Sequence, residues 1–248
     1  MTSPPPTDQP VEQDREHRGR RRLLLGAAVT LVVLAVLAVV AVTSGRSASS
    51  SGTPAASAGD PVAQARLAVA RRQPGDPLAL GSPTAPVVVS EWGDFQCPFC
   101  RLYTTNTQPA LLRRYVDSGA VRIEWHDFAY LGPESVLEAK AARAAGRQGR
   151  FWDFHAALYR DQPPENRGQV TPASLSALAG RLGLDVPRFE HDEADPAIAR
   201  AVTDDQQLGS RLGVGGVPSF VIGDQLLFGA QPLATFQQAI DGALAARR

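Results

Sequence analysis

The stretch VVVSEWGDFQCPFC, residues 87–100, determines how the rest of the sequence is interpreted. Its first six residues are mostly apolar and β-branched, which predicts a buried strand over 87–92. Its last four form a C-x-x-C motif, in which Pro98 suits the first turn of a helix expected to run to about residue 116. The two cysteines of the chain, Cys97 and Cys100, are therefore expected where a strand gives way to a helix.

A sulfur atom at the start of a helix is favoured in its ionised form. Unsatisfied N–H groups and the positive end of the helix dipole gather there, and they lower a cysteine pKa below about 8.5. The thiolate is the species that attacks disulfides. We therefore expect Cys97 to be the exposed nucleophile and Cys100 to be the shielded thiol that resolves a mixed disulfide.

Three other roles for the cysteine pair compete with redox chemistry. A structural disulfide across so short a ring would restrain little chain entropy. A zinc site would need two more ligands, and the candidates His126, His155 and His191 are not spaced as a second ligand pair. Two inert core cysteines would not need to flank a proline at the start of a helix. Redox chemistry is favoured, with no cofactor and no metal expected.

Downstream of the motif, the hydrophobic periodicity changes several times. Residues 121–127 alternate as a second strand, and a long helical block follows over about 133–212. Two more strands, 219–222 and 225–228, are joined by a Gly-Asp turn, and an amphipathic helix occupies about 232–246. This order predicts an α/β domain with a helical insertion.

A second feature lies at the start of the third strand. A glycine-rich turn over residues 213–216 leads into Val217 and Pro218. Proline cannot donate to a sheet ladder, and it is the residue type that permits a cis peptide bond. A phosphate-binding loop is an alternative reading of these glycines, but no Lys-Ser or Lys-Thr pair follows them.

Upstream, composition divides the chain into four parts. Residues 1–22 are polar and end in arginines, whereas 23–42 contain no charge and would span roughly 30 Å as a helix. The arginines predict a single-pass anchor with a cytoplasmic N-terminus, although a cleaved signal peptide or a buried core helix is an alternative. Residues 43–75 are expected to be a flexible extracytoplasmic linker, in part a short helix, and 76–248 the folded domain.

Composition also narrows the class of protein. The 25 basic and 25 acidic residues balance, which argues against nucleic acid as the main partner. An apolar fraction of 44% is enough for the core of one domain. A disulfide-stabilised secreted scaffold would spread its cysteines over distant loops, so we expect no long-range disulfides here.

Four segments together resemble the DsbA-like branch of the thioredoxin superfamily. They are Glu91, the run from Asp94 to Cys100, residues 216–221 and residues 229–232. The likeness covers roughly residue 76 to the C-terminus, including the helical block. It implies a thioredoxin-like α/β fold with a helical insertion.

The resemblance also implies roles for residues near the cysteines. In that family the proline equivalent to Pro218 is cis and faces the cysteine pair. The backbone of the residue before it, here Val217, hydrogen-bonds an extended substrate segment. Pro98 and Phe99, within the motif, are expected to contact substrate and to tune access and potential.

Glu91 is implied to be a buried carboxylate beneath the pair that moves a proton to or from Cys100. An acid within an apolar strand is expected to have a raised pKa, which suits that task. The alternative is a carboxylate at a strand end, hydrated or in a salt bridge. Asp94 and Trp92 are expected to line the site without reacting.

The resulting expectation is a membrane-anchored, extracytoplasmic thiol–disulfide oxidoreductase that introduces disulfides into exported proteins through Cys97 and Cys100. Resemblance alone suggests reoxidation by a membrane partner of the DsbB or vitamin K epoxide reductase type. A reductase or isomerase would use the same parts, and a non-catalytic protein-binding module is a further alternative. The catalytic domain is expected to be monomeric.

Overall fold

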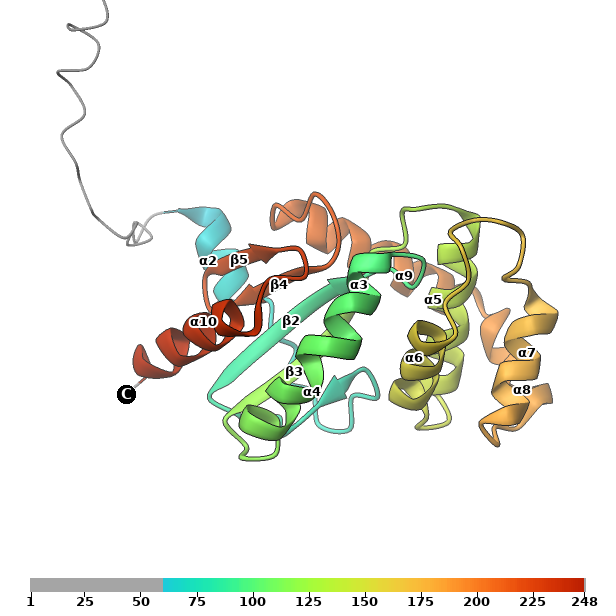
Figure 1. Cartoon of the computed structure of the whole chain (residues 1–248), viewed down its shortest axis with the longest axis horizontal. Helices are drawn as coiled ribbons and strands as arrows, with labels where there is room; N and C mark the ends of the chain where they lie inside the picture. The colour runs from blue at the N-terminus through green and yellow to red at the C-terminus, as the bar shows by residue number, and fades with distance from the viewer. Residues whose placement is uncertain (1–59, 248) are drawn as a thin grey trace, which may run out of the picture. The chain divides into compact units, whose positions relative to one another are not determined.

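The computed structural model describes residues 60–247, which build a five-stranded sheet in the order β1-β3-β2-β4-β5 (Figure 1). The central strands β2 (Val87–Gly93) and β3 (Val121–Asp127) are parallel. On the other side of β2, β4 (Ser219–Ile222) and β5 (Gln225–Phe228) form an antiparallel hairpin. The strands predicted from periodicity are thus confirmed, and with them the α/β fold class.

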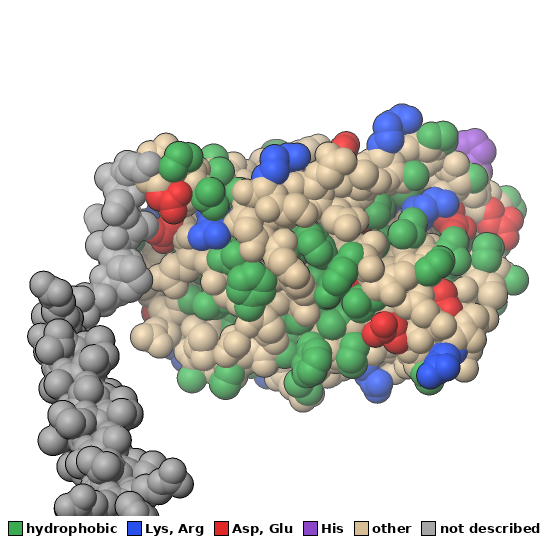
Figure 2. All heavy atoms as spheres, turned by 90° about the horizontal axis from the view of Figure 1, so that it is seen from above, with side chains coloured by type: hydrophobic (Ala, Val, Ile, Leu, Met, Phe, Trp, Pro, Cys, Tyr) green, Lys and Arg blue, Asp and Glu red, His purple; other side chains and the backbone are tan. Residues whose placement is uncertain are grey.

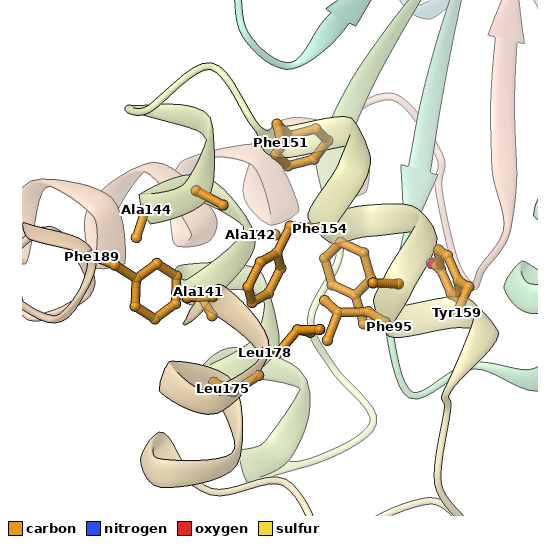
Figure 3. Close-up of a cluster of buried hydrophobic side chains, with 14 of the residues drawn as sticks. Phe95, Ala141, Ala142, Ala144, Phe151, Phe154, Tyr159, Leu175, Leu178 and Phe189 are labelled. Carbon is orange, nitrogen blue, oxygen red and sulfur yellow. The ribbon is translucent and has the colours of Figure 1, made fainter. Parts of the chain in front are cut away.

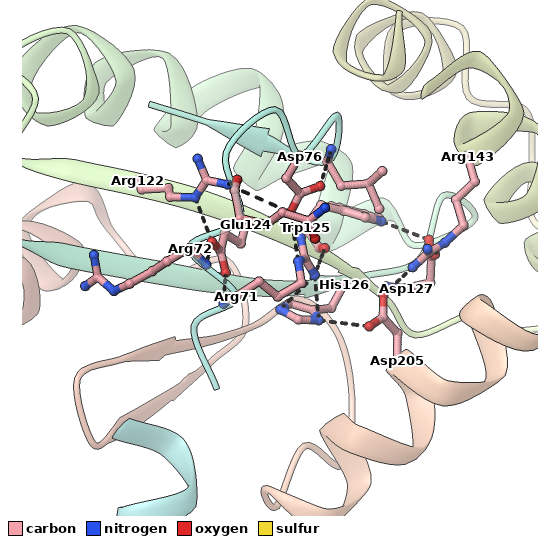
Figure 4. A network of polar contacts seen from close by, with 12 residues as sticks. Arg71, Arg72, Asp76, Arg122, Glu124, Trp125, His126, Asp127, Arg143 and Asp205 are labelled. Atoms are coloured by element: carbon pink, nitrogen blue, oxygen red, sulfur yellow. Dashed lines mark hydrogen bonds and ion pairs between the residues drawn. The ribbon is translucent and has the colours of Figure 1, made fainter. Parts of the chain in front are cut away.

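The N-terminal end of the folded part differs from the prediction. Residues 60–76, which we call the N-terminal strap, begin with helix α2 (Pro61–Leu67), capped by the Asp60 carboxylate. Further along, the backbone N–H groups of Arg71 and Arg72 donate to the buried carboxylate of Glu124 on β3, at 2.7 and 2.8 Å (Figure 4). The short helix expected within the linker is therefore confirmed, but the flexible linker is wrong from residue 60 onward, because the Arg71 and Arg72 backbone binds a carboxylate of the sheet, which composition does not reveal.

One further strand is not predicted from the sequence. Strand β1 (Ala79–Leu80) pairs antiparallel with β3 and forms one edge of the sheet. Two residues are too few to carry an alternating pattern, so periodicity gives no signal for it.

Alternation along β2 separates the two faces of the sheet. Val87 and Val89 belong to a cluster with Phe220 and Phe236, which lies under the helix that follows the cysteines and under α10 (Leu233–Ala245). The even-numbered Trp92 belongs instead to a cluster with Phe128, Leu212, Val214 and Val221, beside the end of the last helix of the insertion. The odd-numbered face therefore lies beneath the cysteine-bearing helix.

The helix after the cysteines is not a regular α-helix. It is continuous over residues 98–116, as predicted, but it contains two π-helical turns. Its parts are α3 (Pro98–Leu102), η1 (Tyr103–Thr107), α4 (Gln108–Leu111) and η2 (Leu112–Val116).

The helical insertion predicted over 133–212 is confirmed. Aromatic and aliphatic side chains from four of its helices meet in a core of their own, with alanines of α5 allowing close approach (Figure 3). Phe95, next to the cysteine motif, is part of the same cluster and joins this core to the site. The five helices are α5 (Pro133–Gly146), α6 (Phe151–Arg160), α7 (Pro172–Arg181), α8 (Val186–Glu193) and α9 (Pro196–Arg211).

Within residues 60–247, none of the helices combines the length and the apolar character needed to cross a bilayer. The predicted anchor at residues 23–42 lies outside the described residues.

Candidate active site

The cysteine pair lies at the carboxyl end of β2, where the chain turns into the helix. Cys97 has extended backbone angles and occupies the N-cap position of α3, and its N–H donates to the Asp94 carbonyl at 3.0 Å. Cys100 lies within the first helical turn, and both thiols are free. Cys100 is fully buried, but Cys97 is only 4% exposed, so the expectation of an exposed nucleophile is wrong for this reduced state.

The two thiols have opposite acidities. A hydrogen bond from the Cys100 thiol is the largest influence that lowers the pKa of Cys97, to about 7, with the N–H groups of Cys100 and Phe99 adding to it against the effect of burial. Burial is the largest influence on Cys100 and raises its pKa well above the ordinary range. Near neutral pH, Cys97 is therefore the sulfur available as a nucleophile.

The strand that begins at Ser219 brings the second predicted element to the cysteines. The Val217–Pro218 peptide bond is cis, and the Cys97 sulfur lies 3.6 Å from the Val217 carbonyl oxygen. The Pro218 carbonyl accepts the N–H of Gly229 at 2.7 Å, which ties this turn to the end of β5. The Val217 backbone is thus directly beside the nucleophile.

The surface around the pair is apolar. Pro98 is exposed, Phe99 is 61% exposed, and Leu102 and Tyr130 are nearly half exposed. Figure 2 shows the side of the molecule that is uppermost in Figure 1, and green apolar side chains gather across its middle while charged groups lie mainly toward its edges. Such a surface suits unfolded or extended protein segments better than small polar molecules.

Glu91 points from β2 into the face beneath the cysteine-bearing helix. Its side chain is fully buried, and burial raises its pKa to about 8. Oε2 accepts a 3.4 Å hydrogen bond from the Gln108 amide, whereas Oε1 has no partner. Its charge also contributes, after burial and Cys97, to the raised pKa of Cys100. The burial excludes the alternative of a hydrated carboxylate at a strand end.

A side chain just after α6 in the insertion contacts the cysteine loop, and the sequence provides no expectation of it. The Gln162 amide, just after α6, donates to the carbonyl oxygens of Phe95 and Cys97 at 2.7 and 3.1 Å. Nothing in the sequence marks this glutamine, because it lies in a polar loop about 65 residues from its partners.

A buried polar chain fixes the residue before the nucleophile. The Gln96 amide donates to Glu138 on α5 at 2.7 Å, and its oxygen accepts the N–H of Asn166 at 2.9 Å. Burial raises the pKa of Glu138 to about 8. Asp94 accepts the N–H groups of Tyr130 and Leu131 at 3.0 and 3.1 Å. These contacts hold the cysteine loop from the side of the insertion.

The candidate ligands His126 and His155 contact other side chains. His126 stacks on Trp92 and contacts Asp205 at 3.0 Å, and His155 is buried among aromatic rings. Burial lowers the pKa of His155 to about 3, so it is neutral in the core. Within residues 60–247, no group of three or more His, Cys, Asp or Glu side chains is arranged to hold a metal ion.

Comparison with known proteins agrees with this geometry. A family model described as thioredoxin matches residues 73–242. The probable disulfide bond formation protein D of Bacillus cereus is 33% identical over 152 residues, covering 60% of this chain and 70% of that protein. The oxidised crystal structure of BdbD from Bacillus subtilis aligns with a TM-score of 0.63 and 26% identity, covering 69% of this chain and 94% of that one.

A second group of relatives is larger. The Na(+)/H(+) antiporter NhaA 1 of Salinispora arenicola is 32% identical over 170 residues, which is 68% of this chain. The chain spans only 25% of that antiporter's length. In that protein, a region similar to this chain is one part of a longer polypeptide.

Proposed function

The chain belongs to the thioredoxin family, as a DsbA-like protein disulfide oxidoreductase, and we propose that it introduces disulfides into exported proteins from a membrane-anchored position outside the cytoplasm. The observation that carries the proposal is the Cys97 thiol, with a pKa of about 7, at a helix start beside the Val217 carbonyl. A thiol of low pKa is a good leaving group and makes a strained or exposed disulfide oxidising.

The proposed reaction is a transfer of two electrons from a client protein. A client thiolate attacks the Cys97 sulfur of the oxidised pair, and the Cys97–Cys100 bond breaks, so that Cys100 leaves as a thiolate and takes up a proton. A second client thiolate then attacks the client sulfur of the mixed disulfide and releases Cys97 as a thiolate. The client gains one disulfide, and the Cys97–Cys100 disulfide is reduced to the dithiol.

The proposed location rests on the sequence. The uncharged run 23–42, preceded by arginines, supports a single-pass anchor with residues 43 onward outside the cytoplasm. An anchored domain would stay close both to emerging clients and to a membrane protein that reoxidises Cys97 and Cys100, of the DsbB or vitamin K epoxide reductase type. Labelling of Cys97 in intact cells by a membrane-impermeant maleimide tests the location, and a thiol protected until lysis would contradict it.

The direction of electron flow is tested by the reduction potential of the cysteine pair, equilibrated with glutathione. We expect a value near about −120 mV, that of a strong oxidant, whereas about −270 mV would indicate a reductase. The same titration in the Cys97→Ser variant serves as the blank.

A reductase or isomerase is the second candidate function, because it would use the same thiols. The Cys97→Ser variant distinguishes a non-catalytic binding module from an oxidoreductase. A binding module would keep its activity toward unfolded clients in this variant, whereas an oxidoreductase would lose the formation of client disulfides entirely.

A further inference from the structure

The π-helical turn η1 changes which side chain lies below Cys100. In a regular α-helix, residues eight apart differ by about 80° around the axis. In η1 the N–H of Gln108 donates to the Tyr103 carbonyl, five residues back, and the extra residue turns the following helix back by about 100°. Gln108 therefore lies almost directly beneath Cys100, on the face that is turned to the sheet.

On that face, Gln108 meets Glu91. The glutamine is buried, and its amide donates to Glu91 Oε2 at 3.4 Å. Within residues 60–247, the other carboxyl oxygen of Glu91, Oε1, has no hydrogen-bond partner. The contact joins the helix that carries Cys100 to the strand that carries the buried acid.

Within residues 60–247, no Lys, Arg or His side chain forms a hydrogen bond or salt bridge with Glu91. The charge of Glu91 contributes to the raised pKa values of Cys100 on α3, Tyr103 on η1 and Tyr159 on α6. Burial raises the pKa of each of them well above its ordinary range, so all three are neutral near pH 7. Gln108 is the side chain that donates a hydrogen bond to the Glu91 carboxyl group.

A primary amide suits both states of an acid. Its NH₂ group donates to a carboxylate, and after a half-turn about its last torsion its carbonyl oxygen accepts from a protonated carboxyl group. A lysine or arginine in this position would favour the carboxylate alone and would lower the pKa of the acid. A neutral amide leaves the acid able to release and recover a proton near neutral pH.

We propose that Gln108 is a positioning residue for disulfide exchange, which orients Glu91 beneath Cys100 and supports the acid in both protonation states. The inference rests on the proposed function and extends it to this residue. When the Cys97–Cys100 disulfide opens, protonated Glu91 gives its proton to the Cys100 thiolate and becomes a carboxylate that accepts from the Gln108 amide. In the reverse step the carboxylate takes the proton back, and the Cys100 thiolate attacks Cys97.

The test replaces Gln108 with methionine in the full-length chain, since methionine keeps the length of the side chain but has no amide. The carbon-13 shift of the Glu91 carboxyl group is followed against pH, together with the rate at which Cys100 displaces a peptide from a mixed disulfide on Cys97. Losing a donor to the carboxylate should move both midpoints upward from about pH 8, by on the order of one unit.

Two controls separate positioning from packing. Thr104→Val alters a buried side chain in the same π turn, whose hydroxyl has no partner, and should leave both midpoints unchanged. In a Glu91→Gln background, Gln108→Met should no longer change the pH profile of release, because the acid is absent. A purely structural role would persist in that background and would overturn the inference.

The outcomes are distinct from those that test the proposed function. An unchanged Glu91 titration in Gln108→Met overturns the role of the amide, even if exchange is normal. A shifted titration with an unshifted release profile overturns the link to Cys100. If the unaltered chain exchanges no disulfides at any pH, the proposed function fails, and the proton-transfer step fails with it.

Discussion

At the scale of single residues, the acidity of Cys97 comes mainly from its neighbour. The sequence predicted a lowered pKa from the helix start, and the backbone N–H groups of Cys100 and Phe99 do contribute. The largest influence, however, is the Cys100 thiol itself. That depends on the orientation of two side chains, which a motif does not specify.

Replacing Cys100 with alanine should therefore raise the pKa of Cys97 from about 7 toward the ordinary value of about 8.5, because the donor to its thiolate is removed. The pH dependence of alkylation by iodoacetamide measures this pKa. In the Cys97→Ala control, the remaining Cys100 should react much more slowly than an ordinary cysteine, since burial raises its pKa. An unchanged pKa for Cys97 in the alanine variant would show that the helix start alone is responsible.

The burial of Glu91 has a consequence for stability. Its pKa rises from 4.5 to about 8 on folding, so the folded protein binds more protons than the unfolded chain between these values. Stability due to this group is present at low pH and falls as pH rises through that window. Glu91→Gln should remove this dependence and stabilise the protein by on the order of 3 kcal/mol at pH 7, with little change near pH 4.

Urea unfolding at a series of pH values measures the effect. Glu190→Gln, at an exposed position on α8, is the matched control and should follow the unaltered protein at every pH. A pH dependence that survives in Glu91→Gln would mean that other groups cause it.

At the scale of elements, a buried ionic network joins the insertion to the sheet. The Arg143 guanidinium on α5 contacts Asp127 at the end of β3 and Asp205 on α9, and the Trp125 ring N–H also donates to Asp127 (Figure 4). All of these side chains are mostly shielded from water. Removing the cation would leave two buried carboxylates without their main partner.

Arg143→Met should therefore destabilise the protein by about 3 kcal/mol or more. Arg160→Met is the control, because Arg160 pairs with Asp161 on the surface, where solvent screens the pair and it contributes little to stability. Denaturant midpoints of the two variants should differ clearly. Similar midpoints would show that the network contributes no more than a surface pair.

The elements that have a periodic pattern in their own sequence were predicted. The features that depend on contacts with residues far away in the chain were not. The hairpin 219–228 has a strand pattern on both sides of its turn, and the block 133–212 shows helical periodicity. The π turns of the helix 98–116 leave no such mark, since the spacing of apolar residues suits an α-helix equally well. Gln108 was missed for this reason, because its position beneath Cys100 depends on the inserted residue.

At the scale of the whole molecule, the N-terminal strap belongs to the folded part. Glu124 accepts from the backbone of Arg71 and Arg72 and from the Arg122 side chain, and Arg71 also contacts the carbonyl of Trp125 (Figure 4). A chain that starts at residue 76 loses these partners of a buried carboxylate. Its melting temperature should lie roughly 5 °C or more below that of a chain starting at residue 60.

Calorimetry on the two truncated chains gives the comparison. Equal melting temperatures would restore the interpretation of residues 60–75 as a linker. The sequence could not decide this point, because arginines in a stretch rich in small residues are typical of linkers and of edge straps alike. Only the partner on β3 distinguishes them.

The strap also determines how mechanical tension would enter the protein. A force applied at Asp60 would be transmitted to the sheet through Arg71 and Arg72, whose backbone N–H groups donate hydrogen bonds to Glu124 on β3. The cysteine loop is fastened separately, by Gln162 from the insertion. Stretching the chain from its N-terminal side should therefore load β3 first, and the reactivity of the Cys97 sulfur should stay unaltered until the contacts of Arg71 and Arg72 with Glu124 break.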